Sequence, residues 1–160
     1  MKTVILVCLL IISFASYAKE KIDIIIIKKS ERILYAVKND KIIKKYNIAL
    51  GRNPKGHKKK EGDKKTPEGY YFVDGKNAKS NFFLSLHTSY PNFHDKRVAA
   101  KNSVNPGEHI AIHGLPSINL LAQYLYNGAD WTDGCIALNN LDMQELWDLT
   151  EEGTQILIKP

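Results

Sequence analysis

The chain has 160 residues, with 23 lysines and arginines against 17 aspartates and glutamates and only two cysteines. This length suits one compact domain with its own hydrophobic core, and two cysteines exclude a disulfide-rich scaffold. Most of the basic residues are lysines, and no aromatic residue is interleaved in the densest basic run, so nucleic acid is a poor candidate as a partner.

The first 18 residues have the pattern of a secretory signal peptide. Lys2 gives a positive start, Val4 to Ile12 form an apolar stretch too short to cross a bilayer, and Ser16-Tyr17-Ala18 place small residues before a cleavage site. No later stretch of the sequence is apolar enough to span a membrane. We therefore expect residues 1–18 to be removed and residues 19–160 to form a single soluble domain beyond the inner membrane. An uncleaved N-terminal anchor is the alternative.

The rest of the chain reads mainly as β-structure. Short runs of apolar, β-branched or alternating residues predict strands at 22–27, 32–38, 41–50, 69–74, 82–87, 109–113, 136–138 and 154–159. Asn39-Asp40 is typical of a hairpin turn, and Gly75 to Ser80 are predicted to form a polar turn. The stretches 51–65 and 89–107 are predicted to be loops.

Two helices are predicted late in the chain. Residues 118–126 are apolar enough for a short helix that ends at Asn127-Gly128, and residues 140–152 have apolar residues at helical spacing behind a capping Asn140. Many short strands with two late helices predict a mainly β, sandwich-like domain without internal repeats.

The basic residues concentrate in residues 55–65, hereafter the lysine loop, which contains six lysines. The simplest interpretation is a solvated, mobile loop. The functional interpretation is attraction to an anionic polymer or membrane surface outside the cytoplasm.

Cys135 is the most informative residue. The other cysteine, Cys8, lies in the predicted leader, so the exported chain would keep one thiol with no partner of its own. Exported proteins usually use cysteines in pairs, and an unpaired thiol retained in an oxidising compartment points to chemistry as a nucleophile. Gly134, directly before it, allows a tight turn in which consecutive backbone N–H groups can stabilise an oxyanion.

A thiol nucleophile needs a base, and the chain has five histidines. His57 lies in the lysine loop, where it would have no fixed position, and His94 lies in another predicted loop. His109 and His113 are four residues apart on a predicted strand, which places both on one side of it. We favour His113, because it ends an apolar strand directly before Gly114.

Several motifs follow one another in an order that is informative as a set: Gly62-Asp63-Lys64-Lys65-Thr66-Pro67-Glu68-Gly69, Ser89-Tyr90-Pro91-Asn92, Ile112-His113-Gly114, Thr132-Asp133-Gly134-Cys135, and Asn140 with Asp142. Together they resemble the catalytic domain of the L,D-transpeptidases (YkuD type), which act on bacterial cell walls. The resemblance covers most of the mature chain. Two positions depart from the family pattern: Asp133 replaces a common histidine, and Ala137 replaces a common arginine.

The resemblance implies a cysteine acyltransferase without a metal or organic cofactor. Cys135 would attack a peptidoglycan stem peptide, His113 would be the base, and the Gly114 carbonyl would orient its ring. The N–H groups of Asp133, Gly134 and Cys135 would form the oxyanion hole. The implied substrate contacts are Ser89, Tyr90, Trp131 and Thr132. The protein would work as a monomer in the periplasm or cell-wall space. The acyl acceptor would be an amine of another stem peptide or of a wall-attached protein.

Three alternatives remain open at this point. The first is a hydrolase on the same scaffold, either an L,D-carboxypeptidase or an amidase. The second is a non-catalytic wall-binding module, against which the retained thiol argues. The third is a zinc site of His109, His113, Asp133 and Cys135, which lacks the paired-ligand spacing of ordinary zinc motifs.

Overall fold

The computed structural model describes residues 20–116, 126 and 128–160. The predicted leader and nearly all of the predicted helix at 118–126 lie outside these residues. The described chain forms β1 (Ile24–Lys28), β2 (Ile33–Lys38), β3 (Lys41–Asn47), β4 (Gly69–Ser80), β5 (Phe83–Thr88), α1 (Phe93–Lys101), β6 (Ala111–His113), β7 (Ile136–Ala137), α3 (Asn140–Leu149) and β8 (Gln155–Lys159). The prediction of a mainly β domain with short helices is confirmed. Within this part of the chain, no helix is long and apolar enough to cross a membrane.

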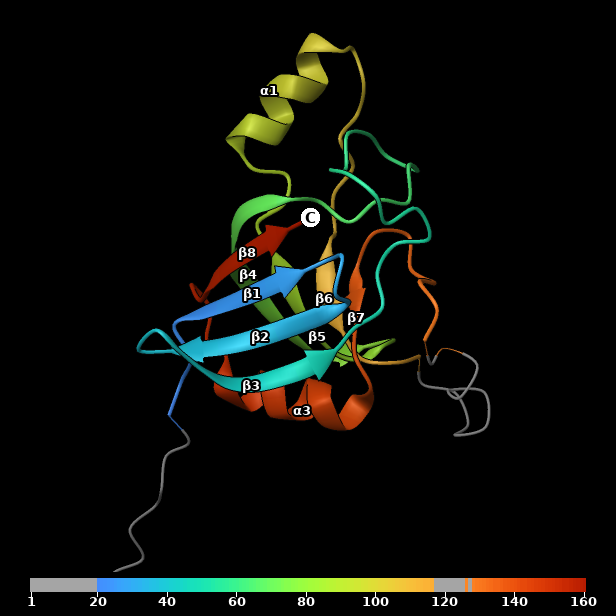
Figure 1. Cartoon of the computed structure of the whole chain (residues 1–160). Helices are drawn as coiled ribbons and strands as arrows, with labels where there is room; N and C mark the ends of the chain where they lie inside the picture. The colour runs from blue at the N-terminus through green and yellow to red at the C-terminus, as the bar shows by residue number, and fades with distance from the viewer. Residues whose placement is uncertain (1–19, 117–125, 127) are drawn as a thin grey trace, which may run out of the picture.

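The strands form one sheet in the order β3-β2-β1-β8-β4-β5-β6-β7. Neighbours are antiparallel except for the pairs β1–β8 and β6–β7, which are parallel. The chain just after β3 also meets β7, because the backbones of Ala49 and Ala137 exchange hydrogen bonds of 2.8 and 2.9 Å. The sheet therefore folds back on itself, and Figure 1 shows β1, β2 and β3 in front of β5, β6 and β7.

The long strand β4 joins the two halves of the sheet. Its first residues pair with β8, and after a register shift between Val73 and Gly75 the strand continues alongside β5. The predicted polar turn at Gly75 to Ser80 is therefore wrong, because these residues belong to β4. Polar residues are compatible with a strand that has one solvated face, and this is why the composition was misleading.

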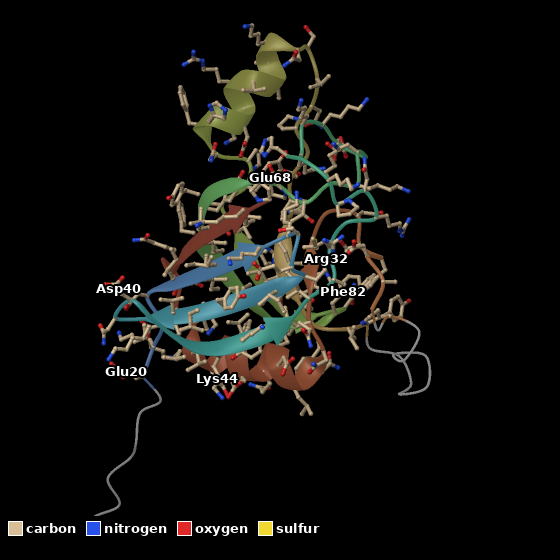
Figure 2. The ribbon with its side chains drawn as sticks, viewed as in Figure 1. Glu20, Arg32, Asp40, Lys44, Glu68 and Phe82 are labelled. Atoms are coloured by element: carbon tan, nitrogen blue, oxygen red, sulfur yellow. The ribbon has the colours of Figure 1, made fainter. Side chains whose placement is uncertain are left out.

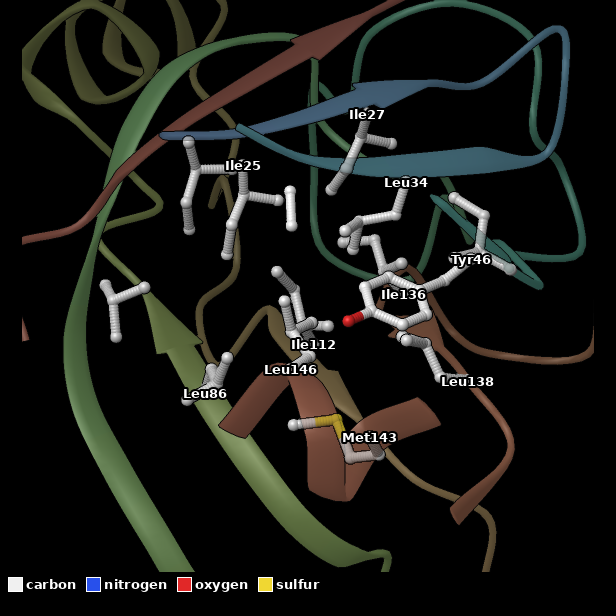
Figure 3. Packing of buried hydrophobic residues seen from close by; sticks show 14 of the residues in the cluster. Ile25, Ile27, Leu34, Tyr46, Leu86, Ile112, Ile136, Leu138, Met143 and Leu146 are labelled. Carbon is white, nitrogen blue, oxygen red and sulfur yellow. The ribbon is translucent and has the colours of Figure 1, made fainter. Parts of the chain in front are cut away.

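Alternating side chains of the strands fill the space between the two layers. Ile25 and Ile27 of β1 are fully buried, whereas their neighbours Ile24 and Ile26 are only partly buried. Figure 3 shows the core, in which the strand residues meet Met143 and Leu146 of α3. Fully burying each such side chain contributes roughly 1.5–3 kcal/mol, so this core is the main source of stability.

The predicted loop at 89–107 contains a helix. Helix α1 begins with a reciprocal capping box, in which Asn92 Oδ1 accepts from the Asp95 N–H and Asp95 Oδ2 accepts from the Asn92 N–H. The Asn-x-x-Asp spacing was the available signal. Only Asp95 and Ala99 of the helix are buried, and the helix projects away from the sheet (Figure 1). It lacks the apolar face by which helices are usually predicted.

Two smaller predictions also need correction. Helix α3 is capped by Asn139, whose side chain accepts from the Asp142 N–H at 2.8 Å, and the Asn140 side chain instead accepts from the Leu115 N–H. The strand β6 begins at Ala111, and His109 has a φ of 62°. His109 therefore does not share a strand face with His113.

The lysine loop is more ordered than its composition suggests. The Asp63 carboxylate accepts from the backbone N–H groups of Lys59, Lys60 and Lys65 and from the Lys58 ammonium, which is only 4% exposed. His57 also has a fixed position, contrary to the prediction. Its Nδ1 accepts from the Glu68 N–H at 3.0 Å, and its Nε2 lies 3.2 Å from Asp95 Oδ1. The loop is thus held to the base of α1 by specific polar contacts.

Candidate active site

Cys135 lies in a tight turn before β7. The Thr132 hydroxyl fixes this turn, because it accepts from the Gly134 N–H at 3.1 Å and donates to the Cys135 carbonyl at 2.7 Å. Gly134 has a φ of 132°, and a Cβ atom there would lie 2.7 Å from the Lys65 carbonyl oxygen. Both the backbone conformation and the space therefore require glycine directly before the thiol.

The segment just after β3 holds this turn from the other side. The Thr132 N–H donates to the Leu50 carbonyl at 3.1 Å, and the Arg52 N–H donates to the Thr132 carbonyl at 3.0 Å. Gly51, between these two residues, donates its N–H to the buried Thr66 hydroxyl at 3.1 Å. The start of the long 51–65 segment and the turn of Thr132 to Cys135 are therefore parts of one hydrogen-bonded unit.

His113 ends β6 and is 4% exposed. Its Nδ1 lies 2.7 Å from the Gly114 carbonyl oxygen, so Nδ1 carries the proton and Nε2 remains an acceptor. Burial lowers the pKa of His113, and the hydrogen bond to Gly114 opposes this shift only in part. A Cβ atom at Gly114 would lie 2.6 Å from Asn140 Oδ1, so this position has no room for a side chain.

An aromatic cluster surrounds the His113 ring. The Phe82 ring lies 4.5 Å from it, the Trp131 ring lies 5.7 Å from it edge-on, and Tyr126 packs on Trp131 at 4.6 Å. Phe82, which precedes β5, is labelled in Figure 2. Sequence reasoning missed Phe82, because its position in a hairpin turn carries no motif. These rings limit the rotation of the imidazole and keep water from one side of it.

Cys135 and His113 line the same surface pocket, which has a volume of about 270 Å³. The Cys135 thiol points to the His109 carbonyl oxygen, with a distance of 3.6 Å from Sγ. Burial raises the pKa of Cys135, and the negative charge of Asp133 raises it further. The Ala111 N–H and the positive charge of Lys58 lower it, but the net shift is upward. The pocket therefore contains a protonated thiol and a neutral imidazole at neutral pH.

The structure separates the residues predicted to contact substrate. Tyr90 is buried and donates its hydroxyl to the Pro106 carbonyl at 2.8 Å, and the Ser89 hydroxyl accepts from the Phe72 N–H at 3.1 Å. Neither residue lines the pocket of Cys135, and Thr132 is buried within the turn that precedes Cys135. Trp131 reaches the site through its ring contact with His113. We therefore do not retain Ser89, Tyr90 and Thr132 as substrate contacts.

The expected oxyanion hole also changes. The Gly134 N–H is already engaged by Thr132, so only the N–H groups of Asp133 and Cys135 remain as candidate donors from the original three. The Asp133 side chain is exposed, and its carboxylate lies 3.5 Å from the Arg52 guanidinium.

The described residues contain no group of three or more His, Cys, Asp or Glu side chains placed to hold a metal ion. Of the four residues in the zinc alternative, His109 faces Glu108 and Asp133 faces Arg52. The zinc alternative therefore has no ligand set in this part of the chain.

Comparison with known proteins identifies the family of the chain. Residues 22–158 match the model of the L,D-transpeptidase catalytic domain, YkuD. A comparison with curated protein sequences finds no match.

Several solved structures share the fold. The helical cell shape determining protein Pgp2 from Campylobacter jejuni superposes with a TM-score of 0.64 at 26% identity, over 89% of this chain and 49% of that chain. Bd1075 from Bdellovibrio bacteriovorus gives a TM-score of 0.58 at 26% identity, over 91% and 50%. An L,D-transpeptidase from Xylanimonas cellulosilytica gives 0.56 at 18% identity, over 88% and 61%, and shows the fold alone.

This chain spans about half the length of the first two structures. The family match, over residues 22–158, covers most of the chain. The chain therefore belongs to the L,D-transpeptidase catalytic domain family.

Proposed function

We propose that this protein is a cysteine-dependent L,D-transpeptidase that acts on peptidoglycan stem peptides in cell-wall cross-linking or remodelling. The observation that carries the proposal is the placement of Cys135 and His113 in one pocket, with the His113 ring fixed by Gly114 at 2.7 Å. Family membership and similarity to a helical cell shape determining protein support a substrate in the cell wall.

In the first half-reaction, Cys135 Sγ attacks the carbonyl carbon between an L-centre and the following D-residue. The thiol proton passes to His113 Nε2, and the carbonyl oxygen becomes an oxyanion that the free N–H groups of Asp133 and Cys135 stabilise. Collapse of this intermediate breaks the peptide bond. The His113 proton goes to the departing amine, which leaves a thioester on Cys135.

In the second half-reaction an acceptor attacks the thioester carbonyl. An amine of another stem peptide or of a wall-attached protein gives a new amide bond, and His113 takes the amine proton and returns it to the Cys135 sulfur. Water gives a free carboxylate by the same route, which is the L,D-carboxypeptidase reaction. Both outcomes use one acyl-enzyme, and the side chains of this chain supply every proton transfer.

We also propose that the enzyme is exported. Cleavage after Ala18 would leave a mature chain with Cys135 as its one thiol, working as a monomer in the periplasm or cell-wall space. Its working environment would then contain the peptidoglycan that the mechanism requires.

The test is mass spectrometry of purified residues 19–160 incubated with a disaccharide tetrapeptide, with and without an added amine acceptor. We expect a covalent adduct on Cys135, release of the terminal D-residue, and a cross-linked product when amine is present. A shortened peptide as the sole product in both reactions would assign the hydrolase activity instead. Absence of both adduct and product would contradict the proposed function.

A further inference from the structure

The pocket beside Cys135 extends to the hairpin between β4 and β5. Its described lining includes Asn77, Lys79 and Ser80 of β4 as well as the thiol and His113. The sheet register explains this neighbourhood, since Asn77 is paired with Ser85 and Ser85 is paired with His113. Because adjacent strands lie about 4.8 Å apart, the backbones of Asn77 and His113 are separated by about 10 Å. A short peptide bound at the thiol therefore comes within reach of the hairpin.

Lys79 is the one permanently charged side chain among the residues that line this pocket, and no carboxylate lines it. The Lys79 ammonium has no ion pair with any residue that the structure describes. Its neighbour Lys76 differs, because the Lys76 ammonium donates to the carbonyls of Trp147 and Thr150 at 2.7 Å each. Lys76 thus serves the fold, whereas the charge of Lys79 remains available to a bound molecule.

Glu108 and Asp133, which are close in sequence to His109 and Cys135 of the pocket, have other partners than Lys79. Glu108 lies 3.0 Å from His109 Nε2, and Asp133 lies 3.5 Å from Arg52. A cation in a pocket without carboxylates attracts an anionic group, and a lysine ammonium is well suited to a carboxylate.

We infer that Lys79 is a specificity-determining residue that binds the α-carboxylate of the leaving D-residue. This inference rests on the proposed function, in which that residue departs from a stem peptide. In an uncross-linked stem peptide the carboxylate lies directly beyond the scissile bond. In a stem peptide joined to another through this carboxyl group, the charge is absent. Lys79 therefore selects uncross-linked peptide ends as acyl donors and disfavours donors whose terminal carboxyl is already in an amide bond.

The test compares three synthetic disaccharide tetrapeptides: one with all carboxylates free, one with a terminal carboxamide, and one amidated at another carboxylate. Release of the D-residue gives kcat/KM for each. We expect the wild-type enzyme to prefer the free terminal carboxylate over the terminal carboxamide by about tenfold, mainly through KM. Amidation at the other carboxylate should have little effect.

In the variant Lys79→Met, kcat/KM on the free acid should fall while kcat/KM on the terminal carboxamide stays the same, so the preference disappears. Lys79→Arg should retain the preference. Lys41→Met is the matched control, because Lys41 is an exposed lysine on β3 outside the pocket. A merely structural role of Lys79 would lower the rates on acid and carboxamide equally.

Binding to the Cys135→Ala protein separates this inference from the proposed chemistry. There, the free acid should bind about tenfold more tightly than the carboxamide, and Lys79→Met in the same background should abolish the difference. This result would support the Lys79 site even if no acyl-enzyme forms with the wild-type protein. An unchanged preference in Lys79→Met, or a preference that follows the other carboxylate, would overturn the inference while leaving the acyl transfer intact.

Discussion

The Nδ1 atom of His113 lies 2.7 Å from the carbonyl oxygen of Gly114, the next residue in the chain. Gly114 is itself fixed, because its N–H is shared between the carbonyls of Phe82 and Leu84 at 3.0 and 3.1 Å. The backbone thus sets the tautomer and the orientation of the imidazole, the role that an aspartate has in a serine triad. Unlike an aspartate, a carbonyl adds no full negative charge, so it raises the pKa of His113 by less than burial lowers it, and the histidine is neutral at rest.

Replacement of Cys135 by alanine should abolish the acyl-enzyme and all turnover while the fold persists. The side chain contributes one sulfur atom to the pocket, and its loss should change the unfolding free energy by less than about 1.5 kcal/mol. Intact-protein mass spectrometry and urea unfolding measure the two effects. Full turnover by Cys135→Ala on a disaccharide peptide would exclude the proposed nucleophile.

Replacement of His113 by alanine should slow turnover by roughly 100- to 10,000-fold, because general-base assistance is lost. The same change at His109 should have a much smaller effect, since His109 is 78% exposed and faces Glu108. His94 on α1 is a second control. Steady-state rates on one soluble substrate decide the matter, and a larger loss in His109→Ala would show that the base was assigned incorrectly.

Alkylation of Cys135 should report its raised pKa. Because burial and Asp133 hold the pKa above the ordinary value of 9.0, the thiol is mostly protonated at neutral pH, and the iodoacetamide rate should keep rising with pH beyond 9. Asp133→Asn removes a negative charge and should lower this pKa, so alkylation at pH 7.5 should become about two- to tenfold faster. Asp40→Asn, in the turn after β2, provides the control. A slower reaction in Asp133→Asn would contradict this electrostatic role.

The fold was predictable where the apolar pattern is strong and local. The isoleucines of β1 and the apolar residues before His113 predict strands, because their side chains fill the core. Helix α1 was missed because its stability comes from the cap of Asn92 and Asp95 and not from an apolar face. The end of β4 was missed because its pairing with β5, a nonlocal contact, overrides its polar composition.

The site was predictable in its reacting groups but not in its surroundings. The glycines next to Cys135 and His113 meet local backbone requirements that a sequence motif can reveal. Phe82 and Lys79, in contrast, approach the site only through the pairing of β4 with β5 and of β5 with β6. The hydrogen bond of the Gly134 N–H could not be predicted from the sequence either. Its engagement by Thr132 depends on a side-chain rotation that no sequence pattern specifies.

Disruption of the buried pair of Lys58 and Asp63 should destabilise the protein. Burial alone would raise the pKa of Asp63, but the N–H groups of Lys59, Lys60 and Lys65 and the Lys58 ammonium outweigh it, so the pKa is lowered. Removing the carboxylate in Asp63→Ala should cost about 3–5 kcal/mol, because it leaves a buried ammonium and unpaired N–H groups. Lys59→Met, at an exposed position, should change stability by less than about 0.5 kcal/mol.

The pH dependence of this stabilisation has a definite sign. A carboxylate with a lowered pKa stabilises the fold above its unfolded value, here near 3.8, and this contribution disappears as the pH falls through the lower folded value. The difference in unfolding free energy between the wild type and Asp63→Ala should therefore be constant at neutral pH and shrink below about pH 4. Urea unfolding across this range measures it, and a difference that grows in acid would contradict the assignment.

The exposed lysines of the lysine loop should attract the enzyme to the cell wall. Lys58 is excluded from this role, because it is buried and its charge lowers the pKa of Cys135. Lys59 and Lys60 are exposed, and their field is screened over about 8 Å at physiological salt. Lys59→Gln with Lys60→Gln should therefore weaken binding to intact sacculi, more at low salt than at high salt, and leave turnover of a soluble muropeptide nearly unchanged.

The matched control is Lys41→Gln with Lys159→Gln, which removes the same charge from exposed strand positions away from the lysine loop. Sacculus pull-down over a salt series, with the soluble assay in parallel, compares the two double variants. If both weaken binding equally, net charge alone governs attraction to the wall. If the Lys59 and Lys60 variant loses soluble turnover to the same extent at every salt concentration, the loop shapes the active site through its contact at Lys65 and Gly134 and does not act as an electrostatic tether.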